Sequence, residues 1–263
     1  DACYLPDGRI LCISNACEQA VPCTGGADVG NLHVMDADGT NERRLTFDQD
    51  HNWNPTVMHD GRVLYTRWEY TDAPHYFSRL LFRMNPDGSG QMEYYGSNSY
   101  WPNAMYWPRP IPGHPTMVSC VVSGHHGVSR SGELVLLDPA KGRHEAAGAV
   151  QKIPGWGKPV EAITMDQLVL DSWPKFAAPW PLAETGTHRG AGKYFLVSVQ
   201  KDAMSAWDLC LVDIFDNRVL IKESPGHALL EPIPLRRTAR PPAVADRIDL
   251  QRQDALIYMT DVY

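Results

Sequence analysis

The sequence predicts an all-β protein, a β-propeller made of four-stranded blades, and three observations carry this prediction. Short strand-like segments recur around Asp-Gly turns at a period of about 50 residues, which is typical of propeller blades. Helical periodicity is almost absent along the chain. The 21 prolines and 21 glycines fall at the ends of strand-like runs, where turns are expected. We expect roughly four to five blades of an incomplete or truncated propeller.

The first half of the chain holds the clearest repeats. The segment "YLPDGRILCIS" (Tyr4–Ser14) returns as "VMHDGRVLYTR" (Val57–Arg67), and in both an Asp-Gly pair separates two strand-like runs, as in a β-hairpin. Apolar and polar residues alternate after the turn, as in a strand with one buried face. Two further units have the order strand, turn, strand: "NLHVMDADGTNERRLTF" (Asn31–Phe47) and "LLFRMNPDGSGQMEYYG" (Leu80–Gly96).

The second half repeats the plan with less regularity. "GELVLLDPAKGRHEA" and "WDLCLVDIFDNRVLIKE" each read as strand, turn and strand, and "MVSCVVS" (Met117–Ser123) and "KYFLVSVQ" (Lys193–Gln200) supply the strands before them. Two stretches rich in Trp, Pro and Gly, Tyr95–Pro115 and Gly155–Gly192, are predicted to be long ordered loops over the propeller. The proline-rich segment Glu231–Val244 is predicted to be an extended strap between blades.

Composition limits the classes of function. The 263 residues suit a single domain spanning 1–263. The net charge of -7 and the lack of a basic run argue against a nucleic-acid partner. No apolar stretch reaches the roughly 18–20 residues of a membrane span. Patterns for nucleophile-elbow hydrolases and for nucleotide binding are absent from the sequence.

Four of the six cysteines, Cys3, Cys12, Cys17 and Cys23, crowd into the first 23 residues. Their spacings match no standard zinc signature, so they are read as disulfide or structural thiols rather than as metal ligands. We predict at least one disulfide among them, because the loop of small residues around them is otherwise poorly anchored. Cys120 and Cys210 lie in apolar runs and read as small buried hydrophobic residues.

The repeats point to a known type of propeller. The units "PDGR" and "MDADGTNERRLT" are similar to TolB-type propeller repeats. The segments "PTVMHDGRVLYTRWEY", "SGHHGVSRSGELVLLDPAKGRHEA", "DSWPKF" and "LVDIFDNRVLI", with "DACYLPDGRI" at the start, resemble the propeller middle domain of the hydrazine synthase alpha-subunit family. This resemblance runs over nearly the whole chain. The Asp-Gly turns in it are generic, whereas the GHHG and TRWEY stretches are more particular.

The resemblance implies a fragment of a longer propeller protein, or a propeller completed by another chain, in a periplasmic or extracellular bacterial setting. Its partners would be the remaining blades, other domains or other subunits. Many family members carry a c-type haem motif C-x-x-C-H further along, and this motif is absent here, so hydrazine synthesis is not implied. The leading hypothesis is a non-catalytic scaffold or binding module without a cofactor of its own. The alternative is a redox enzyme domain with a divalent metal, or with haem held by another segment or chain.

The GHHG turn is the first candidate site. His125 and His126 lie between two glycines directly after an apolar run. Adjacent residues of an extended segment point to opposite sides, so one imidazole can face the propeller channel. Two neutral imidazoles can ligate zinc, copper or iron, but a tight site needs three or four ligands. The sequence therefore leaves two interpretations open, a strand-end turn with hydrogen-bonded histidines and a metal or ligand site.

Further candidate binding residues are charged. In "TRWEY", Arg67 and Glu69 share one face, which fits an ion pair within a blade beside a core Trp, or an anion grip at the channel mouth. Lys158, Glu161 and Lys175 lie on predicted loops, where binding residues tend to occur, and are otherwise read as structural ion pairs.

The two predicted loops also concentrate aromatic residues. Such residues beside prolines can stack on a carbohydrate or form a small core of their own under the loops. The set comprises Tyr100, Trp101, Tyr106, Trp107, Trp156, Trp173 and Trp180.

Overall fold

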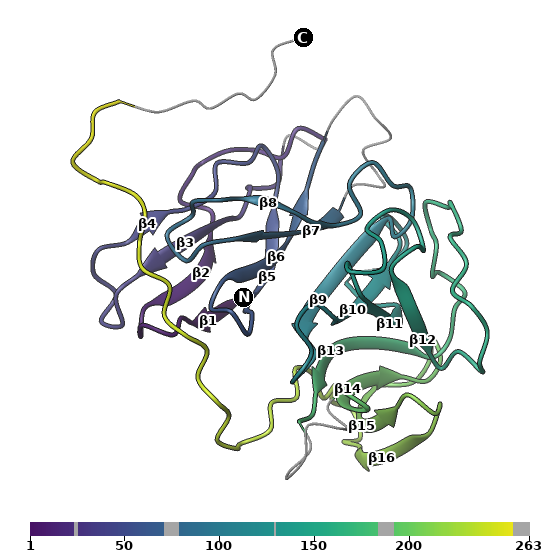
Figure 1. Cartoon of the computed structure of the whole chain (residues 1–263). Helices are drawn as coiled ribbons and strands as arrows, with labels where there is room; N and C mark the ends of the chain where they lie inside the picture. The colour runs from purple at the N-terminus through teal and green to yellow at the C-terminus, as the bar shows by residue number, and fades with distance from the viewer. Residues whose placement is uncertain (24–25, 71–78, 129, 184–191, 255–263) are drawn as a thin grey trace.

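The computed structural model describes residues 1–23, 26–70, 79–128, 130–183 and 192–254, and these form four antiparallel four-stranded blades in sequence order (Figure 1). Blade 1 consists of β1 (Ala2–Tyr4), β2 (Ile10–Ser14), β3 (Asn31–Met35) and β4 (Arg43–Arg44). Blade 2 consists of β5 (Asn52–Val57), β6 (Val63–Trp68), β7 (Arg79–Met84) and β8 (Met92–Tyr95). Blade 3 consists of β9 (Ala104–Pro110), β10 (Val118–Ser123), β11 (Glu133–Leu137) and β12 (Ala149–Ile153). Blade 4 consists of β13 (Lys175–Pro181), β14 (Tyr194–Gln200), β15 (Trp207–Asp213) and β16 (Arg218–Lys222).

The predicted all-β class is confirmed, and the described ranges contain no helix. It follows that none of their elements is a helix long and apolar enough to cross a membrane. A single parallel bridge between Arg79 and Ala104 joins blades 2 and 3 into one larger sheet. The first strands of the blades contact one another in order, β1 with β5, β5 with β9 and β9 with β13, and so form the wall of a central channel.

Asp-Gly turns close the predicted hairpins because glycine accepts a left-handed backbone there. Gly8 and Gly61, with φ values of 100° and 83°, occupy equivalent turns of blades 1 and 2. In each turn the aspartate accepts hydrogen bonds from the arginine two residues later, as Asp60 does from Arg62. This local bonding explains why the outer hairpins could be predicted from sequence.

The prediction of two long loops is wrong in part. Tyr95–Pro115 contains strand β9 and Gly155–Gly192 contains strand β13, the channel strands of blades 3 and 4. Both strands carry proline, which cannot donate a ladder hydrogen bond and therefore disfavours a strand prediction. The structure accommodates the prolines at β-bulges, which interrupt the register of β5, β9 and β13.

The bulges share one backbone signature. The residue before the proline has a positive φ in each case: Asn54 at 49°, Trp107 at 55° and Ala178 at 48°. Neighbouring bulges are also bonded to one another, because the Asn54 side-chain oxygen accepts from the Trp107 N–H at 3.1 Å. The Asn54 N–H in turn donates to the Asp1 carboxylate at 3.0 Å. The channel wall is thus tied from blade to blade.

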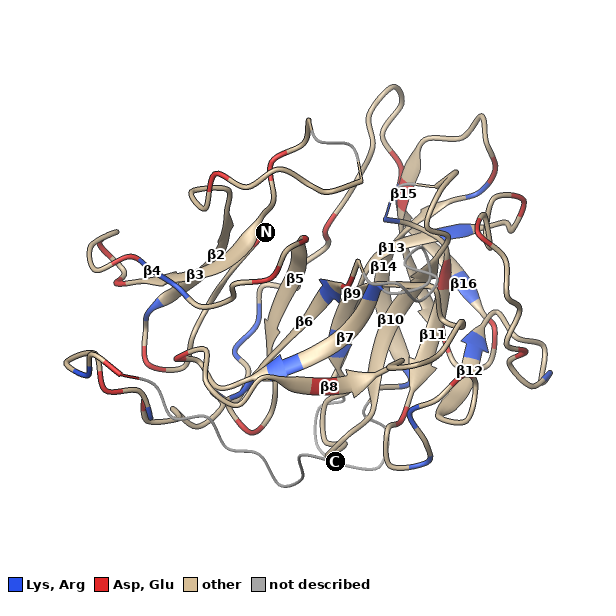
Figure 2. Ribbon diagram, turned by 90° about the horizontal axis from the view of Figure 1, so that it is seen from above, with Lys and Arg blue, Asp and Glu red and all other residues tan. Residues whose placement is uncertain are grey.

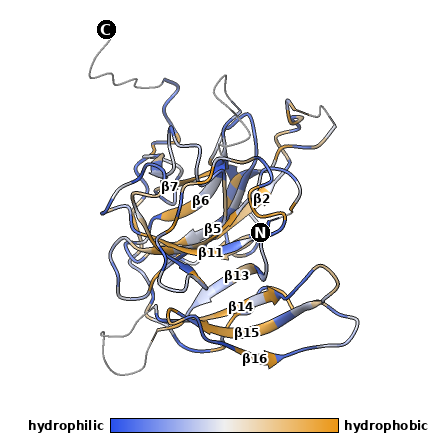
Figure 3. Ribbon diagram, turned by 90° about the vertical axis from the view of Figure 1, so that its right-hand side faces the viewer, coloured by the Kyte–Doolittle hydropathy of each residue, from blue (hydrophilic) through white to orange (hydrophobic). Residues whose placement is uncertain are grey.

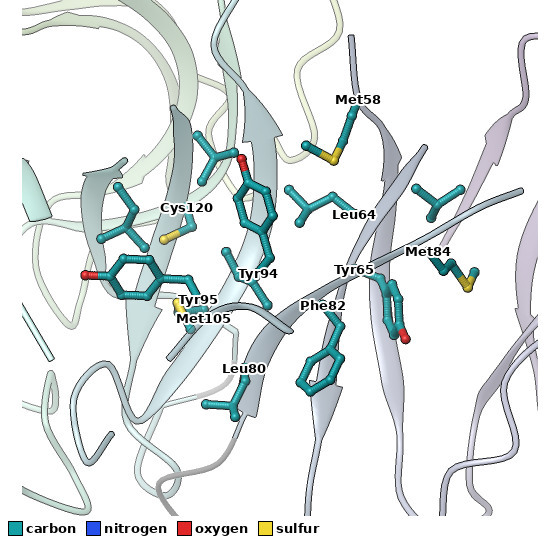
Figure 4. Packing of buried hydrophobic residues seen from close by; sticks show 14 of the residues in the cluster. Met58, Leu64, Tyr65, Leu80, Phe82, Met84, Tyr94, Tyr95, Met105 and Cys120 are labelled. Atoms are coloured by element: carbon teal, nitrogen blue, oxygen red, sulfur yellow. The ribbon is translucent and has the colours of Figure 1, made fainter. Parts of the chain in front are cut away.

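Three buried clusters hold the blades together. The largest joins blades 1, 2 and 3, and Figure 4 shows side chains from it, including Tyr65, Phe82 and Tyr95, packed between strands. A second joins blades 3 and 4, with Leu134, Leu136 and Ile153 on one side and Phe195 and Val197 on the other. The third is aromatic and lies along the channel. Burial of this apolar surface is the main stabilising contribution to such a fold.

The predicted strap is present. The extended segment after β16 runs from blade 4 across to blades 1 and 2 (Figure 1). Arg236 donates to the Ala183 carbonyl at 3.0 Å, and Asp246 pairs with Arg9 at 2.8 Å. The Asp87 carboxylate accepts from the Ile248 N–H at 3.2 Å. The strap is therefore bonded to blades 4, 1 and 2 in turn.

Candidate functional site

The GHHG turn connects β10 to β11, and its first histidine is buried. His125 is 6% exposed, and its backbone N–H donates to the Asp166 carbonyl at 2.9 Å. Its ring packs edge-on against Trp68, with 5.3 Å between ring centroids. The backbone carbonyl of His125 accepts from Arg79 Nη1 at 3.0 Å. The turn is thus fixed to the loop before β13 and to the blade 2 strands.

Arg79 is the central partner of this turn. Its guanidinium lies 4.8 Å from the Trp68 ring and 5.6 Å from the Trp53 ring, and Nη1 also donates to the Tyr106 hydroxyl at 2.9 Å. Nη2 lies 3.4 Å from His125 Nε2. Because a guanidinium only donates, this ring nitrogen acts as an acceptor toward Arg79. The Nε2 atom of His125 therefore faces the positively charged guanidinium of Arg79.

His126 lies on the other side of the turn and is exposed. Its Nδ1 is 2.9 Å from an oxygen of the Asp166 carboxylate, and its ring meets that of His125 edge-on at 4.4 Å. In the part of the chain that the structure describes, no three His, Cys, Asp or Glu side chains are grouped so that they could hold a metal ion. The contacts of the two histidines are those of a hydrogen-bonded turn, and the metal interpretation stays a prediction that elemental analysis of the purified protein can test.

Aromatic rings continue from this turn into the channel. His51 stacks on Trp53 at 4.9 Å between centroids, and Trp53 stacks on Trp68 at 6.2 Å. Tyr106 meets Trp53 edge-on at 5.6 Å. With Arg79 and Arg130 over the Trp53 ring, these side chains fill the channel beside the GHHG turn. These aromatic and arginine side chains offer stacking faces and cations.

His51 is held as a neutral ring in this stack. Its Nδ1 accepts from the Gly30 N–H at 3.0 Å, which places the ring proton on Nε2. Burial lowers the pKa of His51, and the nearby cations Arg130 and Arg79 lower it further. The unfolded chain therefore binds a proton first as the pH falls below about 6.5.

This difference predicts an acid-sensitive fold. Stability from His51 is present above pH about 6.5 and is lost as the pH falls toward the lower folded-state pKa. We expect His51→Asn, whose side-chain oxygen can still accept from Gly30, to reduce the pH dependence of the free energy of unfolding. Urea denaturation near neutral and mildly acidic pH measures it. Burial also lowers the pKa of His33, so part of the pH dependence of the free energy of unfolding should remain in the His51→Asn variant. An unchanged slope in His51→Asn would contradict the assignment, and the exposed His227→Asn is the control.

Arg67 and Glu69 form the ion pair that the sequence suggested as their structural interpretation. Arg67 lies 3.5 Å from the Glu69 carboxylate and 3.1 Å from that of Asp48, and its guanidinium covers the Phe82 ring at 4.7 Å. Trp68 between them is 6% exposed. Burial raises the pKa of Glu69, while Arg67 opposes this shift. These groups are therefore engaged within blades 1 and 2.

Lys158 and Glu161 both line a cavity of about 410 Å³ next to blade 3. Trp156, which is 73% exposed, and Trp173, which is 38% exposed, lie at the same cavity. Trp101, buried, forms part of its wall. This grouping is compatible with stacking on a sugar ring, so the carbohydrate alternative stays a prediction that tryptophan fluorescence against a glycan panel can test.

Lys175 forms no ion pair at hydrogen-bond distance with the residues that the structure describes. Its ammonium group donates to the carbonyls of Val169, Leu170 and Ser172 at 2.7, 2.8 and 2.9 Å, and it lies 3.9 Å from the centre of the Trp173 ring. Burial lowers the pKa of Lys175. The side chain thus closes the loop before β13 through these three hydrogen bonds.

All six cysteines are free thiols in the structure, so the predicted disulfide is not formed there. Cys3 and Cys12 lie on neighbouring strands, but Cys12 pairs with Ala2 and Cys3 pairs with Leu11. Because side chains alternate along a strand, the two thiols point to opposite faces of the blade and cannot be bridged. Cys17 donates to the Val29 carbonyl at 3.2 Å, and Cys23 is exposed. Thiol titration of the unreduced protein tests the prediction directly.

Sequence reasoning missed the residues that organise the GHHG turn. Arg79, Trp53, His51 and Asp166 come from other strands and loops, and no local motif links them to the two histidines. Figure 2 shows acidic and basic residues spread over all four blades, so charge clustering gave no signal either. Each of the three bulged channel strands has a residue with positive φ directly before a proline. The recurrence of such a proline from blade to blade is the sequence signal that could have identified these strands.

Comparison with known proteins defines the fold. No model of a known protein family matches the sequence, and no curated protein does. The structure is similar to that of Kuenenia stuttgartiensis hydrazine synthase, with a TM-score of 0.54 and 13% identity over 82% of this chain and 28% of that chain. Matches of lower TM-score are the tricorn protease (0.47, 10% identity, 88% and 19% covered) and TolB from Acinetobacter baumannii (0.35, 14% identity, 79% and 50% covered). The similarity to hydrazine synthase supports a propeller-like fold, and this chain spans 28% of the length of that matched chain.

Proposed function

We propose that this chain is a non-catalytic propeller scaffold and binding module of a larger extracytoplasmic bacterial protein, as the sequence resemblance implies. Its blades pack against further blades, supplied by the same polypeptide or by another subunit. The stacked rings and cations beside the GHHG turn support a role in holding the shape of this side of the channel. A Soret band, or stoichiometric zinc, copper or iron in the purified protein, would favour the redox alternative instead.

The observation that carries the proposal is the uncovered side of blade 4. Three consecutive apolar residues of β16, Val219, Leu220 and Ile221, are 54%, 51% and 52% exposed. The outer strands β4, β8 and β12 are mostly half-buried or buried. Figure 3 shows the hydrophobic strands of blade 4 at the edge of the molecule. Contiguous exposed apolar surface of this kind marks an interaction site.

A further blade is the occupant that fits this surface. The channel strands contact each other from β1 to β13 in chain order, and the structure shows no comparable contact between β1 and β13. Among the described residues, blade 3 covers one face of blade 4 through the Phe195 cluster, and we assign the other face to the next blade of the series. Propellers bury both faces of a blade by this radial repetition.

Self-association of the isolated chain tests the proposal. If the blade 4 side is an interface, the chain should associate as its concentration rises, and Val219→Lys with Ile221→Lys should keep it monomeric, because two charges oppose burial of the strand. Leu235→Lys, which replaces a fully exposed apolar residue of the strap, should behave like the parent. Analytical ultracentrifugation measures all three. A parent chain that stays monomeric throughout the concentration series would contradict the proposal.

A further inference from the structure

A second cavity lies at the opposite end of the channel from the GHHG turn, and Trp180 is the one sequence candidate among its described lining residues. Its volume is about 710 Å³, within the range of about 300–1,000 Å³ that is usual for small-molecule sites. The ends of β5, β9 and β13 form its walls, and strap residues 236–239 and 241 cover it. Strands of three blades and the strap therefore meet at this one cavity.

Among the described residues that line this cavity, the charged side chains are all positive. They include Arg109, Arg236 and Arg237, and no Asp or Glu is among them. Arg236 donates to the Ala183 carbonyl, whereas Arg237 has no hydrogen bond or ion pair with the described residues. A cavity with this charge attracts anions, and its low-dielectric walls strengthen the attraction.

Arg109 is the clearest of the three. It projects from β9, and its guanidinium lies 4.6 Å from the centre of the Trp180 ring. Its side-chain hydrogen bond goes to the Thr56 hydroxyl, at 3.3 Å. Among the described residues no carboxylate lies within ion-pair distance of it. Burial lowers the pKa of Arg109, and Glu231 and Cys3 act on it only from a distance. A guanidinium held in this way retains unused donors in a fork that matches carboxylate and phosphate oxygens.

The strap is placed to complete the site. Gly61, in the β5–β6 turn, has a φ of 83°, and an added Cβ there would lie 2.1 Å from the Pro242 carbonyl oxygen. The strap thus packs directly on this turn, and the contact sets the position of the neighbouring cavity wall. The equivalent Gly8 of blade 1 has a φ of 100° and nothing within 4 Å of an added Cβ.

We propose that this strap cavity binds a small organic anion, with its carboxylate or phosphate group on Arg109 and Arg237 and its apolar body against Trp180 and Leu182. The site is independent of the proposed interface on blade 4, because it uses the channel ends of β5, β9 and β13. The apolar lining favours an anion with a hydrophobic body over a free inorganic ion.

Calorimetric titration with three probes tests the site and its preference. Phenyl phosphate and benzoate carry the two candidate anions on the same ring, and benzyl alcohol is their neutral counterpart. We expect at least one anion to bind and to raise the thermal unfolding midpoint, and benzyl alcohol not to bind. Arg109→Met, which keeps contact with Trp180 and removes the charge, should weaken anion binding about tenfold or more. Arg218→Met, an exposed arginine of β16, should leave it unchanged.

Two glycine variants test the part that the strap plays. Gly61→Ala should weaken anion binding because it displaces the strap, whereas Gly8→Ala imposes similar backbone strain without that contact and should bind like the parent. The proposal is overturned if no anion binds the parent, if Arg109→Met binds as tightly as the parent, or if the two glycine variants bind alike. Circular dichroism of each variant separates loss of the site from loss of the fold.

Discussion

Replacing Arg79 by alanine is expected to lower the free energy of unfolding by about 3–5 kcal/mol. The variant removes charged hydrogen bonds to the Tyr106 hydroxyl and the His125 carbonyl. It also removes the cation that lies over the Trp53 and Trp68 rings. Both acceptors then lie in an apolar setting without their donor, and this unmet hydrogen bonding accounts for much of the expected loss.

Urea denaturation followed by fluorescence and near-ultraviolet circular dichroism measures the effect, because the stacked tryptophans report on the site itself. Arg83→Ala is a matched control on the same strand, since Arg83 forms its side-chain hydrogen bond to the Met92 sulfur, and we expect a change of about 1 kcal/mol or less. Arg79→Lys keeps the positive charge but loses the forked arrangement of N–H donors. Its free energy of unfolding should therefore lie between those of Arg79→Ala and Arg83→Ala. Equal stabilities of Arg79→Ala and Arg83→Ala would show that Arg79 does not organise the turn.

The outer hairpins of the blades could be predicted because their specificity is local. The pair Asp60-Gly61 combines a carboxylate that bonds the backbone two residues later with a glycine that accepts positive φ. The alternation in Val57–Arg67 then identifies the strands on both sides. A period of about 50 residues connects one such hairpin to the next, and from that repetition the blade architecture follows.

The channel strands could not be predicted in the same way. β9 and β13 carry prolines and tryptophans that, taken locally, indicate loops, and Trp107 and Ala178 have a backbone conformation that is uncommon in strands. Their strand geometry comes from contacts with neighbouring blades. The Asn54–Trp107 hydrogen bond, which joins residues of blades 2 and 3, is an example of information that a short window does not contain.

In the candidate site, too, some features could be predicted from local sequence and others depend on contacts between distant parts of the chain. The GHHG turn was visible because two histidines between glycines after an apolar run are unusual in sequence. The character of the turn depends on Arg79 and Asp166, which belong to other parts of the chain. Arg109 gave no sequence signal, because a single arginine next to prolines is common in proteins. Its position becomes notable only in the structure, where the ends of three strands and the strap meet around it.

Replacing Phe195 by alanine is expected to cost about 3–5 kcal/mol, with the effect concentrated in blade 4. Phe195 is fully buried on β14 and packs in the cluster that joins blade 4 to Leu134 and Leu136 of blade 3. Removing its ring leaves a cavity at the contact that holds this blade to the rest of the protein. Phe215→Ala is the matched control, because Phe215 is 65% exposed and its loss should change stability by about 0.5 kcal/mol or less.

Hydrogen exchange followed along the chain measures where the stability is lost. Among the described residues, blade 4 packs against blade 3 alone, and its outer strand β16 is exposed along its whole length, so few neighbouring side chains can compensate for the missing ring. Amides of β14, β15 and β16 should therefore exchange faster in Phe195→Ala before those of β5–β8 are affected, since local opening follows the weakest packed unit. Uniform acceleration over all four blades would instead mean that the blades unfold as one cooperative unit, and the assignment of blade 4 as the most weakly supported part of the propeller would be wrong.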